Sequence, residues 1–289
     1  MKYGLCSLAW QSPFGGNDPA KFYDEVVRHF EKAKKFGFDI FEVAVENYGY
    51  DVDATIKAAK ETGIELKTVC GAFGPTRDCS SDDPEYRKGG IKYTKYLVDI
   101  ISEFGGEAVV GPIYSAVGKT GMWTDEEKEQ HWAWAVESIK ELADYAAAKG
   151  IKLGIEPLNR FETNLINTTE QCSKLIERID KDNVGYLLDS FHMNIEESSI
   201  PDAIRLAGDK IIDFHTCANN RGTPGEDNFN WPAIKQAIDD VGYDGYCVIE
   251  SFTPDCVEIA AAASVWRPFA PSPDYLAENG VKFLKSVFG

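Results

Sequence analysis

The chain has 289 residues, of which 44% are hydrophobic and 12% aromatic, enough to bury a large core. Its 47 acidic and 30 basic side chains give a net charge of -17, so we expect neither nucleic acid nor an anionic membrane surface as a partner. Seven cysteines without CxxC spacing, and an N-terminus that becomes polar too early for a signal peptide, predict a cytoplasmic protein.

Apolar segments rich in β-branched residues alternate along the chain with amphipathic segments. The apolar segments predict eight strands, at residues 2–9, 39–45, 65–73, 107–114, 152–158, 184–190, 211–216 and 246–252. Helical periodicity predicts helices at residues 22–37, 53–63 and 124–150, each ending in a glycine suited to a helix C-cap. Thr124 and Glu127 have the spacing of a capping box at the start of the third helix.

Eight strand–helix units in fewer than 300 residues predict an α/β fold, a (β/α)8 barrel of parallel strands. The alternative, a doubly wound open sheet, would favour a glycine-rich GxGxxG loop after the first strand, and the sequence there is "SLAWQSPFGGN". No linker divides the chain. We therefore expect residues 1–289 to form a single domain.

Charged or titratable side chains stand at the ends of the last four predicted strands. Strand five delivers Glu156, strand six Asp189, strand seven His215 and strand eight Glu250. Each follows an apolar run, where an uncompensated charge is costly to bury. Because the carboxyl ends of barrel strands meet at one face, these four side chains are expected to converge there.

Three carboxylates and one imidazole form a ligand set for a single divalent cation. The set suits Mn²⁺, Co²⁺ or Mg²⁺ better than a structural zinc, which favours thiolates. Such a cation would also offset three buried negative charges. The alternative is that the four groups pair with basic side chains inside the barrel, for which the sequence offers Arg160 and Arg221 nearby.

Other polar residues follow the same strand ends. Glu162 lies in the loop after strand five, His192 comes three residues after Asp189, and Arg221 comes six residues after His215. Alone, His192 would be interpreted as a packed loop residue. Arg221 could likewise be a surface charge or a partner of a nearby glutamate, Glu226. Their joint placement favours contacts with a substrate.

Three stretches resemble the ketose 3-epimerases, the D-tagatose/D-allulose (psicose) 3-epimerase family of the xylose-isomerase-like barrels. They are "IEPLNRFETNLINT", "LLDSFHMNIEE" and "FHTCANNRGTPG". The resemblance implies one divalent cation, Mn²⁺ foremost with Co²⁺ or Mg²⁺ as alternatives, held by Glu156, Asp189, His215 and Glu250. It further implies that Glu156 and Glu250 are the acid/base pair and that three residues hold the O1–O3 end of a sugar: Glu162, His192 and Arg221.

The activity implied is C3 epimerisation of a free ketose, of the D-allulose/D-fructose, D-tagatose/D-sorbose or L-ribulose/L-xylulose type. One glutamate would remove the C3 proton, a cis-enediolate would form, and the other glutamate would return a proton to the opposite face. A homodimer or homotetramer is expected from the same resemblance.

The sequence departs from the family pattern at several positions near the distal half of the expected sugar or the barrel mouth. Ser251 stands where many members have proline, and the following loop lacks a double glycine. Glu226 and Asp227 replace a turn that usually contains glycine, and "SLAWQSP" differs from the usual aromatic-rich first loop. Four aromatic residues are candidates to wall the sugar, although core packing explains each singly: Trp10, Trp123, Phe252 and Trp266.

Three other functions remain open. An aldose–ketose isomerase of the hydroxypyruvate or xylose isomerase type would share the barrel, and commonly uses a second metal and a lysine near the sugar. A DNA-repair endonuclease would need a histidine-rich site with three metals, whereas this chain has 4 histidines. A non-catalytic sugar-binding protein would not need the pair of glutamates.

Overall fold

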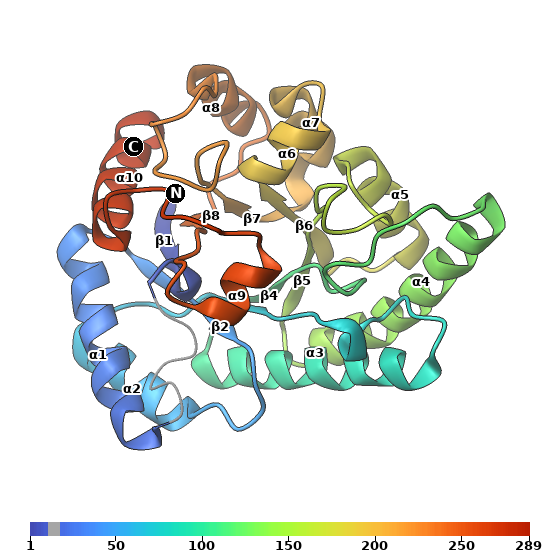
Figure 1. Ribbon diagram of the computed structural model, residues 1–289, viewed down its shortest axis with the longest axis horizontal. Helices are drawn as coiled ribbons and strands as arrows, with labels where there is room; N and C mark the ends of the chain where they lie inside the picture. Colours follow the sequence, from blue (N-terminus) through green and yellow to red (C-terminus); the bar gives the residue numbers. More distant parts are fainter. Residues whose placement is uncertain (11–17) are drawn as a thin grey trace.

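The computed structural model describes residues 1–10 and 18–289; the end of the unusual first loop, from residue 11, lies outside this range. Its strands form a closed parallel barrel in sequence order, with the last strand pairing with the first (Figure 1). The strands are β1 (Lys2–Cys6), β2 (Ile40–Val45), β3 (Thr68–Gly71), β4 (Ala108–Gly111), β5 (Lys152–Ile155), β6 (Val184–Asp189), β7 (Ile211–His215) and β8 (Tyr246–Ile249). The predicted (β/α)8 barrel is confirmed.

Helices surround the barrel as an outer ring (Figure 1). The α-helices are α1 (Pro19–Phe36), α2 (Val52–Thr62), α3 (Pro84–Phe104), α4 (Asp125–Ala147), α5 (Thr169–Ile179), α6 (Ser190–Glu196), α7 (Ile200–Ala207), α8 (Trp231–Asp240), α9 (Val257–Ala262) and α10 (Pro273–Phe288). Short 3-10 helices are η1 (Ser7–Ala9), η2 (Pro75–Arg77) and η3 (Gly208–Lys210). Among the described helices, none has the length and apolar character required to cross a bilayer.

Helix ends follow the local chemistry of the sequence. The capping box of Thr124 and Glu127 is present at the start of α4, with both reciprocal hydrogen bonds. Gly37 and Gly63 end α1 and α2 in left-handed conformations, as predicted. The prediction for Gly150 is wrong: α4 stops at Ala147, and Gly150 takes its positive φ in the turn that follows.

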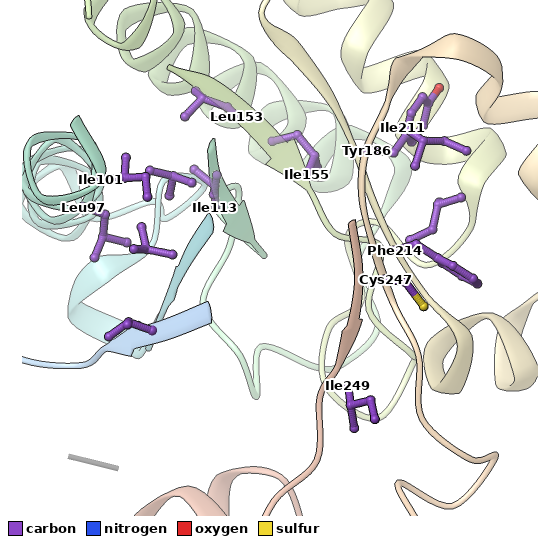
Figure 2. Packing of buried hydrophobic residues seen from close by; sticks show 14 of the residues in the cluster. Leu97, Ile101, Ile113, Leu153, Ile155, Tyr186, Ile211, Phe214, Cys247 and Ile249 are labelled. Carbon is purple, nitrogen blue, oxygen red and sulfur yellow. The ribbon is translucent and has the colours of Figure 1, made fainter. Parts of the chain in front are cut away.

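Two apolar layers hold the barrel. Successive strand residues point to opposite faces, so Val109 faces the surrounding helices while Val110 packs inside the barrel. Figure 2 shows side chains of α3, such as Leu97 and Ile101, pointing from the helix toward the strands. Each such fully buried aliphatic side chain contributes about 1.5–3 kcal/mol relative to its exposed state.

Most strands end earlier than predicted at their carboxyl ends. The fifth ends at Ile155 rather than at residue 158, and the eighth ends at Ile249 rather than at residue 252. Apolar character continues past both ends because the residues beyond them, such as Leu158, are buried in the loops that form the barrel mouth. Burial there reflects loop packing and not pairing in the sheet.

Candidate active site

The structure brings together the four predicted metal ligands. Asp189 and His215 are the last residues of β6 and β7, while Glu156 and Glu250 directly follow β5 and β8. All four are buried, and one ligand atom from each lies within 4.8 Å of the others. We call these four residues the ligand cluster.

Asp189 is fixed by the helix that follows it. Its Oδ1 accepts hydrogen bonds from the main-chain N–H groups of Phe191 at 2.6 Å and His192 at 3.4 Å, so the carboxylate is the N-cap of α6. The strand therefore runs directly into a helix whose first turn orients the side chain. Oδ2 is left to face the interior of the cluster, 4.0 Å from Nδ1 of His215.

His215 fits the role of a metal ligand. Its Nδ1 lies 3.6 Å from Oε2 of Glu250, and within the described part of the chain neither ring nitrogen has a hydrogen-bond partner. A buried imidazole nitrogen that faces two carboxylates without donating to either suits a shared cation. Burial lowers the pKa of His215, but the negative charges of Glu42 and Glu250 outweigh it and raise the pKa well above its ordinary value.

Arg221 is buried at the centre of the site. Its Nη1 donates to Oδ2 of Asp189 and to Oε2 of Glu250, at 2.8 Å for the latter. The interpretations of Arg221 as a surface charge or as a partner of Glu226 are therefore wrong. Pairing with arginine, the alternative to a metal, is observed for two members of the cluster. The Arg221 guanidinium pairs with two of the three carboxylates, and Glu156 has no arginine or lysine partner among the described ion pairs.

The two glutamates of the cluster occupy different electrostatic environments. Burial raises the pKa of Glu156 well above its ordinary value, and the carboxylates of Glu250 and Asp189 raise it further. Burial also raises the pKa of Glu250, but the positive charges of Arg221 and His215 outweigh burial and hold it below its ordinary value. The excess negative charge around Glu156 is the part that a divalent cation would offset.

His192 is held by the loop after β5. The main-chain N–H of Asn159 donates to Nδ1 at 3.0 Å, and Nε2 lies 2.9 Å from Nη2 of Arg221 and 3.5 Å from Oε1 of Glu156. Burial and the charge of Arg221 lower the pKa of His192 to about 3, so the ring is neutral at neutral pH. The side-chain amide of Asn159 also donates to Oε1 of Glu162 at 2.8 Å. Asn159 thus joins two of the predicted substrate contacts.

A cavity of about 510 Å³ opens above the ligand cluster, within the range of small-molecule sites. Its polar lining includes five of the predicted site residues: Glu156, Glu162, His192, Arg221 and Glu250. Its apolar lining includes Leu8, Phe73, Pro112, Val117, Leu158, Phe252 and the alanines 261–263 at the end of α9. The floor can hold charge and hydroxyl groups, whereas the walls offer apolar surface.

The aromatic candidates divide between wall and scaffold. Within the described residues, Phe252 lines the cavity. Trp10 is buried in the outer core, and Trp123 stacks on His131 with ring centroids 4.1 Å apart. Trp266 is 75% exposed and lies outside the cavity lining. Among these four described side chains, Phe252 is therefore the one that lies where it could wall a sugar.

The structure gives the contacts of two residues that depart from the family pattern. Ser251 is buried, and its Oγ donates to the main-chain carbonyl of Arg221 at 2.6 Å. Glu226 accepts a hydrogen bond from the hydroxyl of Tyr275 at 2.6 Å, and neither Glu226 nor Asp227 is part of the cavity lining.

Sequence reasoning missed two acidic residues beneath the cluster. Glu42 in β2 is fully buried and accepts a hydrogen bond from the hydroxyl of Thr68 at 2.7 Å. Asp213 in β7 is also fully buried, and burial together with the charge of Glu42 raises its pKa to about 8. The signal was a single acidic letter inside each apolar strand, in "IFEVAV" and "IIDFHT". Neither residue stands at a strand end, where the carboxyl ends of barrel strands direct attention.

Comparison with known proteins places the chain in a family. The family model described as xylose isomerase-like TIM barrel matches residues 30–287. A probable ketose 3-epimerase of Synechocystis sp. is 32% identical, over 100% of this chain and 97% of the relative. The D-psicose 3-epimerase of Agrobacterium fabrum is 33% identical, over 100% of both chains.

Solved structures agree with these relatives. The fold matches a D-psicose 3-epimerase crystallised in the presence of D-fructose, with a TM-score of 0.88, 32% identity and 100% of both chains covered. It also matches the D-allulose 3-epimerase of Methylomonas sp. in complex with D-allulose, with a TM-score of 0.91, 27% identity and coverage of 99% and 97%. The chain therefore belongs to the xylose isomerase-like TIM barrel family and, within it, to the ketose 3-epimerases, isomerase-class enzymes that act on carbohydrates.

Proposed function

We propose that this protein catalyses metal-dependent C3 epimerisation of a free ketose. The observation that carries the proposal is the position of Glu156 and Glu250. Both line one cavity, they come from the non-adjacent strand ends of β5 and β8, and both belong to the ligand cluster. Two carboxylates so placed can bracket one carbon atom from opposite faces.

Inversion at C3 requires one group to take the proton and another to return a proton on the other face. Glu156 and Glu250 supply these two groups, and their roles exchange when the reaction runs backwards from the other epimer. A divalent cation held by the ligand cluster, Mn²⁺ in our proposal with Co²⁺ or Mg²⁺ as alternatives, supplies Lewis acidity for the sugar oxygens next to C3.

The remaining polar residues bind the O1–O3 end of the sugar. Arg221 offers a buried positive charge to the oxygen that becomes negative in the cis-enediolate, and neutral His192 lies beside it. Glu162 lines the same cavity and can accept from a sugar hydroxyl. Asn159 holds both Glu162 and His192, so the three contacts form one connected unit.

The substrate belongs to the class that the relatives' names describe. D-psicose and L-ribulose 3-epimerases are among them, which supports a ketose of the D-allulose/D-fructose, D-tagatose/D-sorbose or L-ribulose/L-xylulose type. An aldose–ketose isomerase would be expected to place a lysine near the sugar. The described residues that line the cavity include none, which favours epimerisation.

Deuterium exchange tests the reaction directly. The Mn²⁺-loaded protein is incubated with each ketose in heavy water, and the label is followed by NMR. We expect deuterium at C3 and both C3 epimers in the mixture. Label at C1 or C2 with an aldose product would contradict the proposal in favour of the isomerase, and binding without any exchange would favour a sugar-binding protein.

Glu250→Gln tests the acid/base pair. We expect the loss of one proton-transfer group to lower kcat by about 10²–10⁴-fold while the fold is kept. Glu226→Gln is the matched control, because Glu226 lies outside the cavity lining. Full activity in Glu250→Gln would remove Glu250 from this role.

A further inference from the structure

Glu42 is a carboxylate buried inside the barrel beneath the ligand cluster. It lies in the middle of β2, is fully buried and is not part of the cavity lining. A bare carboxylate at such a place is costly unless its oxygens have partners. Because Glu42 is absent from the cavity lining, it is not a candidate sugar contact, and its burial requires another explanation.

The two oxygens of Glu42 face different groups. Oε2 accepts the hydrogen bond of the Thr68 hydroxyl at 2.7 Å, which fixes the plane of the carboxylate. Oε1 lies 3.1 Å from Nε2 of His215, within hydrogen-bond distance but without the angles of a hydrogen bond. Glu42 thus stands between a neutral donor on β3 and the imidazole on β7.

The two ring nitrogens of His215 face different groups. Nδ1 faces the carboxylates of the cluster, 3.6 Å from Glu250 and 4.0 Å from Asp189. Nε2 points the other way, toward Glu42. A neutral imidazole that gives a lone pair to a cation through one nitrogen carries its proton on the other nitrogen.

We propose that, when the divalent cation is bound, Glu42 is a positioning residue that accepts the Nε2–H of His215 and thereby holds Nδ1 toward the cation. A carboxylate behind a ligating histidine fixes its tautomer and ring orientation and makes it a stronger donor to the metal. The inference rests on the metal site of the proposed function, and it does not depend on which sugar is epimerised.

Asp213 is the competing carboxyl for the same nitrogen. Its Oδ2 lies 4.0 Å from Nε2 of His215, farther than the 3.1 Å of Glu42, and its Oδ1 accepts from the main-chain N–H of Phe214 at 2.7 Å. Asp213 is therefore bound to its own strand, whereas Glu42 faces the ring. A substitution at Asp213 is therefore a matched control for a substitution at Glu42.

The test measures Mn²⁺ affinity by isothermal titration calorimetry, without any sugar. Glu42→Gln keeps an acceptor oxygen but removes the charge, and we expect about tenfold weaker binding. Glu42→Leu removes both, and we expect about a hundredfold loss. Asp213→Asn should stay close to the wild-type affinity. Thr68→Val, which releases the carboxylate, should fall between wild type and Glu42→Leu.

A second readout reports the ligand geometry itself. The visible spectrum of the Co²⁺-loaded protein should change in Glu42→Gln and stay unchanged in Asp213→Asn. Far-ultraviolet circular dichroism checks the fold of each variant. If Glu42→Leu does not fold, the conclusion rests on Glu42→Gln. Wild-type Mn²⁺ affinity with an unchanged Co²⁺ spectrum in Glu42→Gln would overturn the proposal, as would an equal loss in Asp213→Asn. A wild-type protein that binds Mn²⁺ but exchanges no deuterium would contradict the proposed function alone.

Discussion

The backbone of Arg221 takes a left-handed conformation, with φ at +66°, which is uncommon for a residue with a side chain. Its carbonyl oxygen accepts the hydrogen bond of the Ser251 hydroxyl at 2.6 Å. Because Ser251 directly follows Glu250, this bond ties the loop after β7 to the end of β8. The guanidinium is thus held beside the cluster by its own main chain as well as by its ion pairs.

Ser251→Ala should weaken the site without changing its charged groups. A hydrogen bond of this kind contributes about 1 kcal/mol, so we expect kcat/KM for the ketose to fall about fivefold. Steady-state epimerisation kinetics measure the change. Ser138→Ala is the matched control. Ser138 lies in α4, away from the cavity, and its buried hydroxyl donates to the main-chain carbonyl of Cys79 at 2.9 Å. Equal kcat/KM in Ser251→Ala and wild type would contradict this role.

At the scale of elements, the loops after β3, β4 and β5 are joined at the barrel mouth. The main-chain N–H of Gly118 donates to the carbonyl of Glu162 at 2.7 Å, and that of Asn164 donates to the carbonyl of Lys119 at 2.9 Å. The main-chain N–H of Val117 also donates to the carbonyl of Phe73 at 2.8 Å. We call this set of backbone bonds the loop clasp. Glu162 is therefore positioned by the loop after β4 as well as by its own.

Lys119 anchors the loop clasp from below. Its ammonium lies 2.8 Å from Oδ2 of the buried Asp78 and donates to the carbonyl of Ser80 at 3.1 Å. Lys119→Met leaves Asp78 buried without its cation, and we expect a loss of about 3 kcal/mol in the free energy of unfolding. A higher KM for the ketose should accompany it, because Glu162 loses its support.

Urea denaturation and steady-state kinetics check both effects. Lys174→Met removes an exposed i,i+4 pair with Glu170 and should leave the free energy of unfolding and KM close to wild type. If Lys119→Met were no more destabilising than Lys174→Met, the anchor would not exist.

At the scale of the whole molecule, the ligand cluster joins four strand ends of one closed barrel. A cation that binds the folded chain and not the unfolded chain adds about 2.7 kcal/mol of stability at a hundred times its dissociation constant. We expect Mn²⁺ to raise the melting temperature of EDTA-treated protein by about 5 °C in calorimetry. Asp189→Asn and His215→Gln should reduce this shift. An unchanged melting temperature in wild type would contradict cation binding by the cluster.

Much of this architecture was predictable because parallel barrel strands are apolar on both faces and alternate regularly with helices. The four members of the cluster stood out as titratable residues at strand ends. Glu42 and Asp213 did not, since a single acidic letter inside a strand does not reveal which face it takes or what it contacts. The joined loops were equally hidden, because backbone bonds between loops depend on their shape and not on a residue pattern.

Three sequence predictions concern properties outside the barrel geometry. Organisation of residues 1–289 as one domain, assembly as a homodimer or homotetramer, and a cytoplasmic location stay predictions. Sedimentation velocity would measure the assembly state.

The loop clasp also determines how this protein can be recombined with its relatives. Segment 112–121 shares main-chain hydrogen bonds with segment 73–80 and with segment 158–164, so these loops are shaped to one another and not only to their own strands. A chimera that imports one of these loops from another ketose 3-epimerase would place it against native loops of a different shape. A chimera that imports all three would keep the complete set of main-chain hydrogen bonds. To alter sugar preference, the three loops at this side of the barrel should therefore be exchanged together.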